Sequence, residues 1–228
     1  MNRELNLVIA GLSGQGIVMA GKMLTTALVA DGKKVIISDS LALTHRNAPT
    51  STQIRVGEDV ASLMIGEGQA DLVVAFEATE GLKAGLVYAR QDGLVILNDR
   101  VLRRRASAAQ PKAGDSDASP ITKILQGFER AGIRDVRVFP GSDVAQNEVG
   151  RLLTLNMVML GATVATDMIP VRLATVEQVI QELSPRGTGE VNVAAFKAGV
   201  KRFKEQSRTE GERPGRELST ATETPRGS

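Results

Sequence analysis

A glycine-rich turn between an apolar segment and an amphipathic one constrains the fold of this chain more than any other feature. Residues 5–10 (LNLVIA) form an apolar run typical of a buried parallel strand, and the turn Gly11-Leu-Ser-Gly-Gln-Gly16 follows directly. Apolar side chains at helical spacing then predict a helix over 17–28, which Asp31-Gly32 ends before a second strand at 35–37. This N-terminal segment therefore predicts a βαβ unit whose glycine turn lies at the start of its helix.

The rest of the chain continues the alternation of short strands and helices. Strands separated by helices of about 10–15 residues favour a parallel sheet. We therefore predict an α/β fold, a three-layer α/β/α arrangement with a mostly parallel, Rossmann-like sheet. The predicted strands are 52–56, 72–76, 94–97 and 136–139, and the predicted helices are 78–90, 121–131, a helix from about Ser142, 152–165, and 175–183 with a capping box of Thr175 and Gln178.

The chain of 228 residues is predicted to form one folded domain over residues 1–204, followed by a disordered tail. Within residues 205–228 only Leu218 and Ala221 are hydrophobic. Such a segment cannot bury enough apolar surface to offset the entropy lost on ordering. An arginine-rich stretch at 100–120 interrupts the regular pattern, and it is either a solvated loop or a basic docking surface.

The composition excludes several classes of function. Without cysteine the chain cannot form disulfides, thiolate zinc sites or cysteine-ligated iron–sulfur clusters, and its single histidine, His45, excludes multi-histidine metal sites. The 28 basic and 26 acidic residues nearly balance and aromatic residues are 3%, unlike a nucleic-acid-binding surface. No apolar run reaches the roughly 18 residues that a membrane span needs, and the start does not resemble a signal peptide. We therefore expect a cytoplasmic protein that binds neither nucleic acid nor membrane and that has no metal-binding residue of its own.

The glycine turn is the strongest candidate binding site. Its spacing is G-x-x-G-x-G, whereas the dinucleotide fingerprint is G-x-G-x-x-G. Both patterns place unobstructed backbone amides at a helix N-terminus, which favours a phosphate or another anion. Asp39, expected just past the second strand, would then take the place of a ribose-binding acid. The alternative is that the glycines only form a tight strand–helix connection.

Other polar residues have both a functional and a structural interpretation. Arg46 and Arg55 would bind an anionic ligand as a pair, or they face solvent. Glu77 and Glu80 follow the end of a predicted strand, where ligand sites cluster in α/β folds, or they cap a helix. Asn156 interrupts an apolar helix and needs a hydrogen-bond partner if it is buried.

Four segments of this chain occur in an order that resembles a known family. The segments are Gly11–Gly16, the stretch from Arg46 through Gln53-Ile-Arg55-Val-Gly57, Ala70-Asp-Leu-Val-Val-Ala-Phe-Glu77, and Asn156-Met-Val-Met-Leu-Gly161. Together they resemble the gamma-type subunits of the 2-oxoacid:ferredoxin oxidoreductases, most of all the small (beta) subunits of members that act on indolepyruvate. The resemblance covers about residues 4–204. No single motif is decisive, but the ordered set is specific.

The resemblance implies a non-autonomous subunit of a complex that oxidatively decarboxylates a 2-oxoacid, such as indolepyruvate or pyruvate. The products are an acyl-CoA and carbon dioxide, and the electrons pass to ferredoxin. Thiamine diphosphate, magnesium and iron–sulfur clusters are then expected in partner subunits, since this chain has no cysteine and no Gly-Asp-Gly followed by a suitably spaced Asn. The resemblance therefore implies that this chain carries no catalytic residue of its own. In this family the gamma-type domain packs beside the thiamine-binding domains and can help shape the coenzyme A side of the site. The contact residues that the resemblance implies are Gly11, Ser13, Gly14, Gln15, Gly16 and Arg46.

Two positions depart from the usual pattern of the family. Ser13 replaces the middle glycine of G-x-G-G-Q-G, and residues 45–49 (HRNAP) stand where Gln-Arg-Gly-Gly is typical. Pro49 stiffens that loop, and the two missing glycines remove a close backbone approach. The alternatives to the subunit hypothesis are a free-standing NAD(P)-binding enzyme that uses the glycine turn and Asp39, and a purely structural scaffold subunit.

Overall fold

The computed structural model describes residues 4–41, 48–101 and 119–211, and a six-stranded sheet forms its centre. The strand order is β2-β3-β1-β4-β5-β6. Neighbouring strands from β1 to β6 in this order are parallel, while β3 is antiparallel to both β1 and β2. The strands are β1 (Leu5–Leu12), β2 (Val35–Leu41), β3 (Pro49–Val56), β4 (Ala70–Ala75), β5 (Ala89–Asn98) and β6 (Asp135–Phe139).

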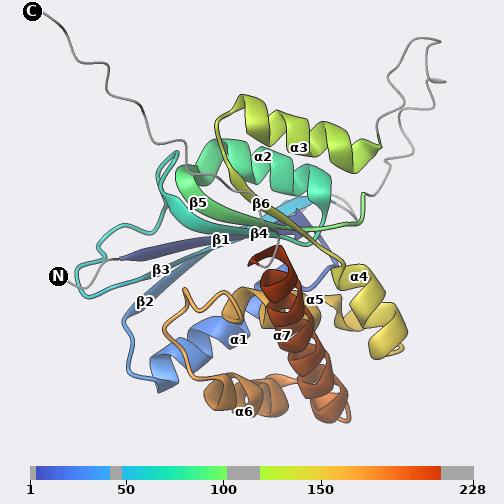
Figure 1. The fold of residues 1–228 in the computed structure, drawn as a ribbon. Helices are drawn as coiled ribbons and strands as arrows, with labels where there is room; N and C mark the ends of the chain where they lie inside the picture. Colours follow the sequence, from blue (N-terminus) through green and yellow to red (C-terminus); the bar gives the residue numbers. More distant parts are fainter. Residues whose placement is uncertain (1–3, 42–47, 102–118, 212–228) are drawn as a thin grey trace, which may run out of the picture.

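Helices cover both faces of the sheet, so the predicted three-layer α/β/α fold with a mostly parallel sheet is confirmed (Figure 1). On one face lie α2 (Ala78–Tyr88) and α3 (Pro120–Arg130). The other face carries the larger layer: α1 (Ile17–Ala30), the short α4 (Gly141–Asp143) with a π-helical turn at Val144–Glu148 and a 3-10 turn at Leu152–Thr154, α5 (Leu155–Val164), α6 (Leu173–Leu183) and α7 (Gly189–Gly211).

The antiparallel strand β3 is inserted between β1 and β2. Its central residue Thr52 is paired with Ile9 of β1 on one side and with Asp39 of β2 on the other. The two strands of the predicted βαβ unit are therefore not neighbours. Asp39 lies inside β2 rather than beyond it, which corrects the prediction, and its carboxylate accepts a hydrogen bond of 2.5 Å from the Thr52 hydroxyl.

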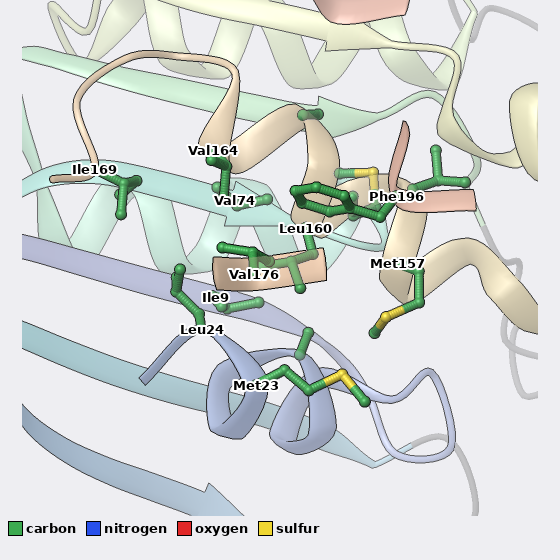
Figure 2. Packing of buried hydrophobic residues seen from close by; sticks show 14 of the residues in the cluster. Ile9, Met23, Leu24, Val74, Met157, Leu160, Val164, Ile169, Val176 and Phe196 are labelled. Atoms are coloured by element: carbon green, nitrogen blue, oxygen red, sulfur yellow. The ribbon is translucent and has the colours of Figure 1, made fainter. Parts of the chain in front are cut away.

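The apolar core lies mainly between the sheet and the larger helical layer (Figure 2). Alternate residues of β1 point to opposite faces, so Ile9 packs into this core and Val8 into the smaller one under α2 and α3. Because both faces of β1 and β4 are buried, these strands are continuous apolar runs. Within the described residues, no helix combines the length and the apolar character needed to cross a bilayer.

The two helices α5 and α7 cross in backbone contact, which two glycines permit. A Cβ at Gly161 of α5 would collide with the Phe196 carbonyl and lie 2.8 Å from the Val200 nitrogen of α7. A Cβ at Gly199 of α7 would collide with the carbonyl of Val158 in α5. The chain therefore has no room for a side chain on either side of this crossing.

Helix α7 also moves the boundary of the folded domain. The predicted tail at 205–228 starts too early, because α7 continues to Gly211, and residues 212–228 lie outside the described part of the chain. The Gln206 side chain donates a 2.9 Å hydrogen bond to the Val138 carbonyl at the edge of β6. Phe203 packs against Phe139 with ring centroids 6.0 Å apart. These anchors order a polar segment that could not order itself. Of the arginine-rich stretch, residues 102–118 also lie outside the described residues.

A buried carboxylate joins the end of α1 to the start of α6. Asp31 accepts hydrogen bonds from the Arg172 backbone nitrogen at 2.7 Å, from the Arg172 guanidinium at 2.6 Å and from the Thr175 hydroxyl at 2.7 Å. The predicted capping box of Thr175 and Gln178 is therefore wrong: α6 begins at Leu173, and Thr175 binds Asp31 instead. Hydrogen bonds from Arg172 hold the pKa of the Asp31 carboxyl well below its usual range.

This low pKa predicts a pH-dependent contribution to stability. Asp31→Asn is expected to lower the free energy of unfolding by about 1–2 kcal/mol at pH 7, since charge-assisted bonds are lost but the exposed Arg172 is screened by solvent. A carboxylate whose pKa is lowered in the folded state stabilises the folded protein at pH values above its pKa in the unfolded chain, near 3.9. The difference between the two proteins should therefore shrink as the pH falls below about 4.

Urea unfolding followed by circular dichroism at pH 7, 5 and 3 measures this difference. Asp59→Asn is the matched control, because Asp59 is exposed. A destabilisation by Asp31→Asn that stays the same at all three pH values would contradict a role for the charge.

Candidate functional site

The glycine turn has a backbone that only glycine adopts readily. Gly14 has a φ of 91° and Gly16 a φ of 80°, both in the left-handed region. Gly16 is the N-cap of α1, and no side chain in the described part of the chain caps that end of the helix. The start of α1 thus has the geometry that the sequence predicts for an anion site, and the binding of an anion there stays a prediction.

The polar atoms of Gln15 bond the main chain, although the residue also forms part of the pocket wall described below. Its side-chain oxygen accepts a 2.7 Å hydrogen bond from the Leu12 backbone nitrogen, and its side-chain nitrogen donates to the Phe76 carbonyl at 3.3 Å. Gly11 makes room for it, because a Cβ at Gly11 would lie 2.6 Å from the Gln15 oxygen. The resemblance places Gln15 and Gly11 at coenzyme A. In the structure, the contacts of these two residues fix the conformation of the turn.

The remaining predicted contact residues divide between the described and the undescribed parts of the chain. Ser13 is exposed, and its backbone nitrogen donates a 2.8 Å bond to the Ala48 carbonyl, which ties the turn to the segment before β3. Arg46 and His45 lie outside the described residues, so a contact from Arg46 stays a prediction.

A pocket of about 340 Å³ opens beside the glycine turn. Three structural elements meet there: the turn with the first part of α1, the start of α5, and the connection between α6 and α7. Most of the lining is apolar, including three methionines, which adapt to ligands of different shape. The lining residues are Gly14, Gln15, Gly16, Met19, Met23, Arg151, Leu153, Thr154, Asn156, Met157, Pro185, Thr188, Val191 and Asn192.

Arg151 supplies a positive charge to this pocket. It lies just after Gly150, whose φ of 78° turns the chain, and just before the 3-10 turn that leads into α5. Its side chain is exposed, and within the described residues its guanidinium forms no ion pair. An unpaired arginine near an uncapped helix N-terminus favours a ligand that carries a negative charge.

Asn156 joins α5 to the glycine turn. A Cβ at Gly16 would lie 2.5 Å from the Asn156 side-chain nitrogen, so the two segments touch only because residue 16 is glycine. The side-chain oxygen of Asn156 accepts a 3.0 Å bond from the Met157 backbone nitrogen. Asn156 thus interrupts an apolar helix, as predicted, and lies half-buried at the pocket wall near the N-terminus of α5.

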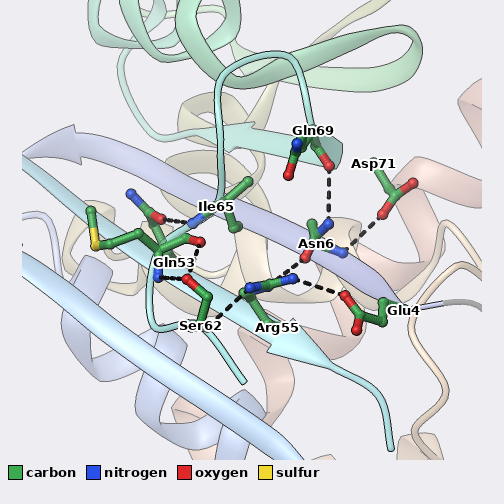
Figure 3. A network of polar contacts seen from close by, with 9 residues as sticks. Glu4, Asn6, Gln53, Arg55, Ser62, Ile65, Gln69 and Asp71 are labelled. Atoms are coloured by element: carbon green, nitrogen blue, oxygen red, sulfur yellow. Dashed lines mark hydrogen bonds and ion pairs between the residues drawn. The ribbon is translucent and has the colours of Figure 1, made fainter. Parts of the chain in front are cut away.

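Two other candidate groups have structural roles. Glu77 is the N-cap of α2 and accepts a 2.8 Å bond from the Glu80 nitrogen, which confirms the capping interpretation. Arg55 lies at the opposite end of β1 from the turn, where it binds Glu4 at 2.8 Å and Asn6 at 3.0 Å (Figure 3). Arg55 therefore does not line the pocket.

A second hollow, of about 310 Å³, lies at the carboxyl end of β5 and is more polar. It is lined by Asp99, Arg100, Ser142, Asp143, Gln146 and Leu152. Burial raises the pKa of the Asp99 carboxyl, and the nearby Asp143 carboxylate adds to the effect. In the described part of the chain, no group of three or more His, Asp or Glu side chains is placed to hold a metal ion.

Sequence reasoning missed Arg151 and the α6–α7 connection as parts of the pocket. The only local signal at Arg151 is the preceding Gly150. The packing of α5 on α1 brings Arg151 and Gly14 to the same pocket, and this packing is not encoded near either residue. The assembled pocket can hold an apolar group with an anionic neighbour, and its described lining residues include no Ser, His, Lys, Asp or Glu.

Comparisons with known proteins agree with this fold. The family model described as pyruvate ferredoxin/flavodoxin oxidoreductase matches residues 6–202. Indolepyruvate oxidoreductase subunit IorB of Thermococcus kodakarensis is 31% identical over 203 residues, which is 89% of this chain and 98% of that protein. Among solved structures, pyruvate oxidoreductase subunit PORC from Thermotoga maritima has a TM-score of 0.64 at 22% identity and covers 88% of this chain and 97% of its own.

A third similar protein is a larger chain. The 2-oxoglutarate:ferredoxin oxidoreductase from Magnetococcus marinus, solved with 2-oxoglutarate, coenzyme A and succinyl-CoA bound, has a TM-score of 0.64 at 17% identity. The similarity covers 90% of this chain and 32% of that one. At such identities the two solved structures establish the fold only.

Proposed function

Because the chain belongs to the pyruvate ferredoxin/flavodoxin oxidoreductase family, we propose that it is a non-autonomous subunit of a complex that oxidatively decarboxylates a 2-oxoacid. The substrate is indolepyruvate or a related 2-oxoacid, and the products are an acyl-CoA, carbon dioxide and two electrons that pass to ferredoxin. The observation that carries this proposal is the match over nearly the whole described domain together with the absence of redox ligands from the sequence.

The composition of this chain implies that the redox groups of the complex are held by other subunits. With no cysteine it cannot ligate iron–sulfur clusters, and one histidine leaves little for other redox metals. Thiamine diphosphate with its magnesium, and the clusters, are therefore assigned to partner subunits. A cytoplasmic location of the complex is part of the same proposal.

The role left for this chain is to bind and orient coenzyme A. The pocket beside the glycine turn lies at the small end of the usual range for small-molecule sites, about 300–1,000 Å³, so it fits one part of that cofactor. Its apolar walls suit the pantetheine arm, and the uncapped start of α1 with Arg151 suits a phosphate. The amides of Gly14 and Gly16 and the guanidinium of Arg151 would hold the anion, while the methionines exclude water from the arm.

The free-standing NAD(P)-binding alternative fits the geometry poorly. Strand β3 separates Asp39 from β1 and the glycine turn, and the Asp39 carboxylate is bonded to Thr52. The Gln15 side chain also fills the position between β1 and β4 where a dinucleotide would approach the turn.

The test of the proposed function is reconstitution. The purified chain alone should be colourless and should not reduce a viologen dye with any 2-oxoacid and coenzyme A. Adding the partner subunit or subunits with bound thiamine diphosphate and clusters should give dye reduction that depends on both the 2-oxoacid and coenzyme A.

Two results would contradict it. Turnover by the lone chain would favour a free-standing enzyme. Full activity of the partners without this chain would favour a scaffold role, which native mass spectrometry of the assembled complex would then examine.

A further inference from the structure

Open α/β sheets usually bind ligands in a crevice at the carboxyl ends of two neighbouring strands whose helices leave to opposite faces. In this chain those strands are β1 and β4, since α1 follows β1 on one face of the sheet and α2 follows β4 on the other (Figure 1). The glycine turn Gly11–Gly16 borders this crevice. The pocket found beside it, however, lies on the α5 side of the turn.

Side-chain amides of the chain itself close the crevice. The Phe76 carbonyl, directly after β4, accepts bonds from the side-chain nitrogens of Gln15 at 3.3 Å and Asn98 at 3.0 Å. Asn98, at the end of β5, also accepts a 3.0 Å bond from the backbone nitrogen of Ser142, which follows β6. We call Gln15, Asn98 and Ser142 the amide seal. It links the carboxyl ends of all four neighbouring parallel strands.

The buried members of the seal are fully bonded, while Gln15 is half-buried and also forms part of the pocket wall. Asn98 has no exposed surface, Ser142 is 7% exposed, and no buried side-chain nitrogen or oxygen in the described residues lacks a partner. Two glycines give it room: Gly11 lies against the Gln15 oxygen, and a Cβ at Gly141 would be 3.1 Å from the Asn98 oxygen. The side-chain amides of Gln15 and Asn98 that border the crevice are therefore already bonded within the chain.

Gln15 is the part of the seal that lies within the glycine turn. Its two hydrogen bonds fix the turn at Leu12 and at Phe76, on either side of the crevice. With its polar atoms bonded to the main chain, Gln15 lines the pocket between α1, α5 and α7 together with the flanking Gly14 and Gly16. The Gln15 side chain thus fills the ligand position in the crevice between β1 and β4, and it leaves the glycine turn facing the pocket beside α5.

We propose that Gln15 is a positioning residue that determines where the turn binds its ligand. By closing the crevice between β1 and β4, it directs the anion-binding backbone of Gly14 and Gly16 to the pocket beside α5. This inference rests on the proposed function for the identity of the ligand, coenzyme A, and it concerns how this chain selects the side on which that ligand is bound.

The test measures steady-state kinetics of the assembled complex carrying Gln15→Ala, Gly11→Ala or both changes. Each single change should raise the KM for coenzyme A about tenfold, while kcat and the KM for the 2-oxoacid change less than twofold. The double variant should be no worse than the more affected single variant, because both changes disturb one contact. Gln178→Ala is the control, since Gln178 is an exposed glutamine of α6 whose side chain bonds Glu182.

Each outcome decides for or against the inference. If Gln15→Ala prevents assembly, Gln15→Met, which keeps the side-chain length without the hydrogen bonds, takes its place. An unchanged KM for coenzyme A in the single variants would overturn the proposal, and so would additive effects in the double variant. A parallel rise in both KM values with a fall in kcat would indicate general damage and would also overturn it.

This failure differs from failure of the proposed function. If the unaltered complex requires coenzyme A but the Gln15 variants behave like it, only the positioning role is lost. If the unaltered chain is active alone, the subunit proposal fails. Hydrogen exchange of the Leu12 amide, which Gln15 protects, then tests the seal in the lone chain, and exchange no faster in Gln15→Met would count against it.

Discussion

Gly199→Ala and Gly161→Ala are each expected to lower the free energy of unfolding by about 3 kcal/mol, because a methyl group at either position meets backbone rather than flexible side chains. The Gly199 methyl would meet the Val158 carbonyl, and the Gly161 methyl the Phe196 carbonyl. Helix backbones cannot move apart locally without separating the whole α5–α7 crossing. Relief would therefore cost packing around Phe196 and Leu160, which are buried in the core (Figure 2).

Thermal and urea unfolding of the lone chain measure this loss. Gly127→Ala is the matched control, since it is also a helical glycine, and its methyl would meet only the flexible end of Leu82 at 3.0 Å. It should be neutral or slightly stabilising through the higher helix propensity of alanine. Equal stability of Gly127→Ala and Gly199→Ala would mean that α5 and α7 are not in backbone contact.

Arg151→Ala in the assembled complex is expected to raise the KM for coenzyme A about tenfold or more, because one charge-assisted bond contributes about 1.5–3 kcal/mol. The KM for the 2-oxoacid should stay within twofold, since the thiamine chemistry is assigned to the partner. Gly14→Val should act in the same direction, because a β-branched residue strains a backbone with a φ of 91°. Arg46→Ala, measured in the same way, tests the predicted contact between Arg46 and coenzyme A. Arg46 itself lies outside the described residues.

Arg134→Ala is the control for Arg151→Ala. Arg134 is also exposed, and it precedes β6 at the opposite end of that strand from the pocket side. If Arg151→Ala and Gly14→Val both assemble and keep the KM for coenzyme A unchanged, the pocket does not hold the cofactor. The glycine turn would then be a structural connection, as in the scaffold alternative.

Much of the fold is encoded in short-range pattern. β1 and β4 were predictable because strands buried on both faces are continuous apolar runs. The direction of β3 was not, since alternation in residues 52–56 gives a strand but not its partners. The pairing of β3 with β2 determines the surroundings of Asp39. The local sequence predicts a position near a ribose, whereas in the sheet the Asp39 carboxylate bonds the Thr52 hydroxyl.

Helix α7 was missed although its signal is present. Phe196, Gly199 and Phe203 lie at helical spacing on the face that meets α5 and β6, but lysine, glutamate and arginine dominate the surrounding sequence. The polar residues of 205–211 suggested disorder when read alone. The anchor at Phe203 and the bond from Gln206 are tertiary contacts, which composition does not reveal.

The candidate site was only half predictable for a similar reason. Positive φ at Gly14 and Gly16 follows from glycine in a strand–helix turn, so the binding backbone could be located. The inward rotation of Gln15 could not, because a glutamine at a turn serves a ligand or the main chain equally well. Arg151 reaches the turn from a distant segment, and only the packed helices bring the two together.

The α5–α7 crossing sets the order in which the molecule can mature on the ribosome. The sheet strands β1 to β6 and α5 are all translated before α7, so the face of α5 that contains Gly161 has no partner until residue 199 has emerged. At about 5–20 residues per second, the stretch from Val164 to Gly211 takes several seconds to synthesise. For that interval the apolar surface around Leu160 and Phe139 lacks the partner that α7 supplies. Release of a truncated product in this window should favour aggregation or capture by a chaperone over a folded intermediate.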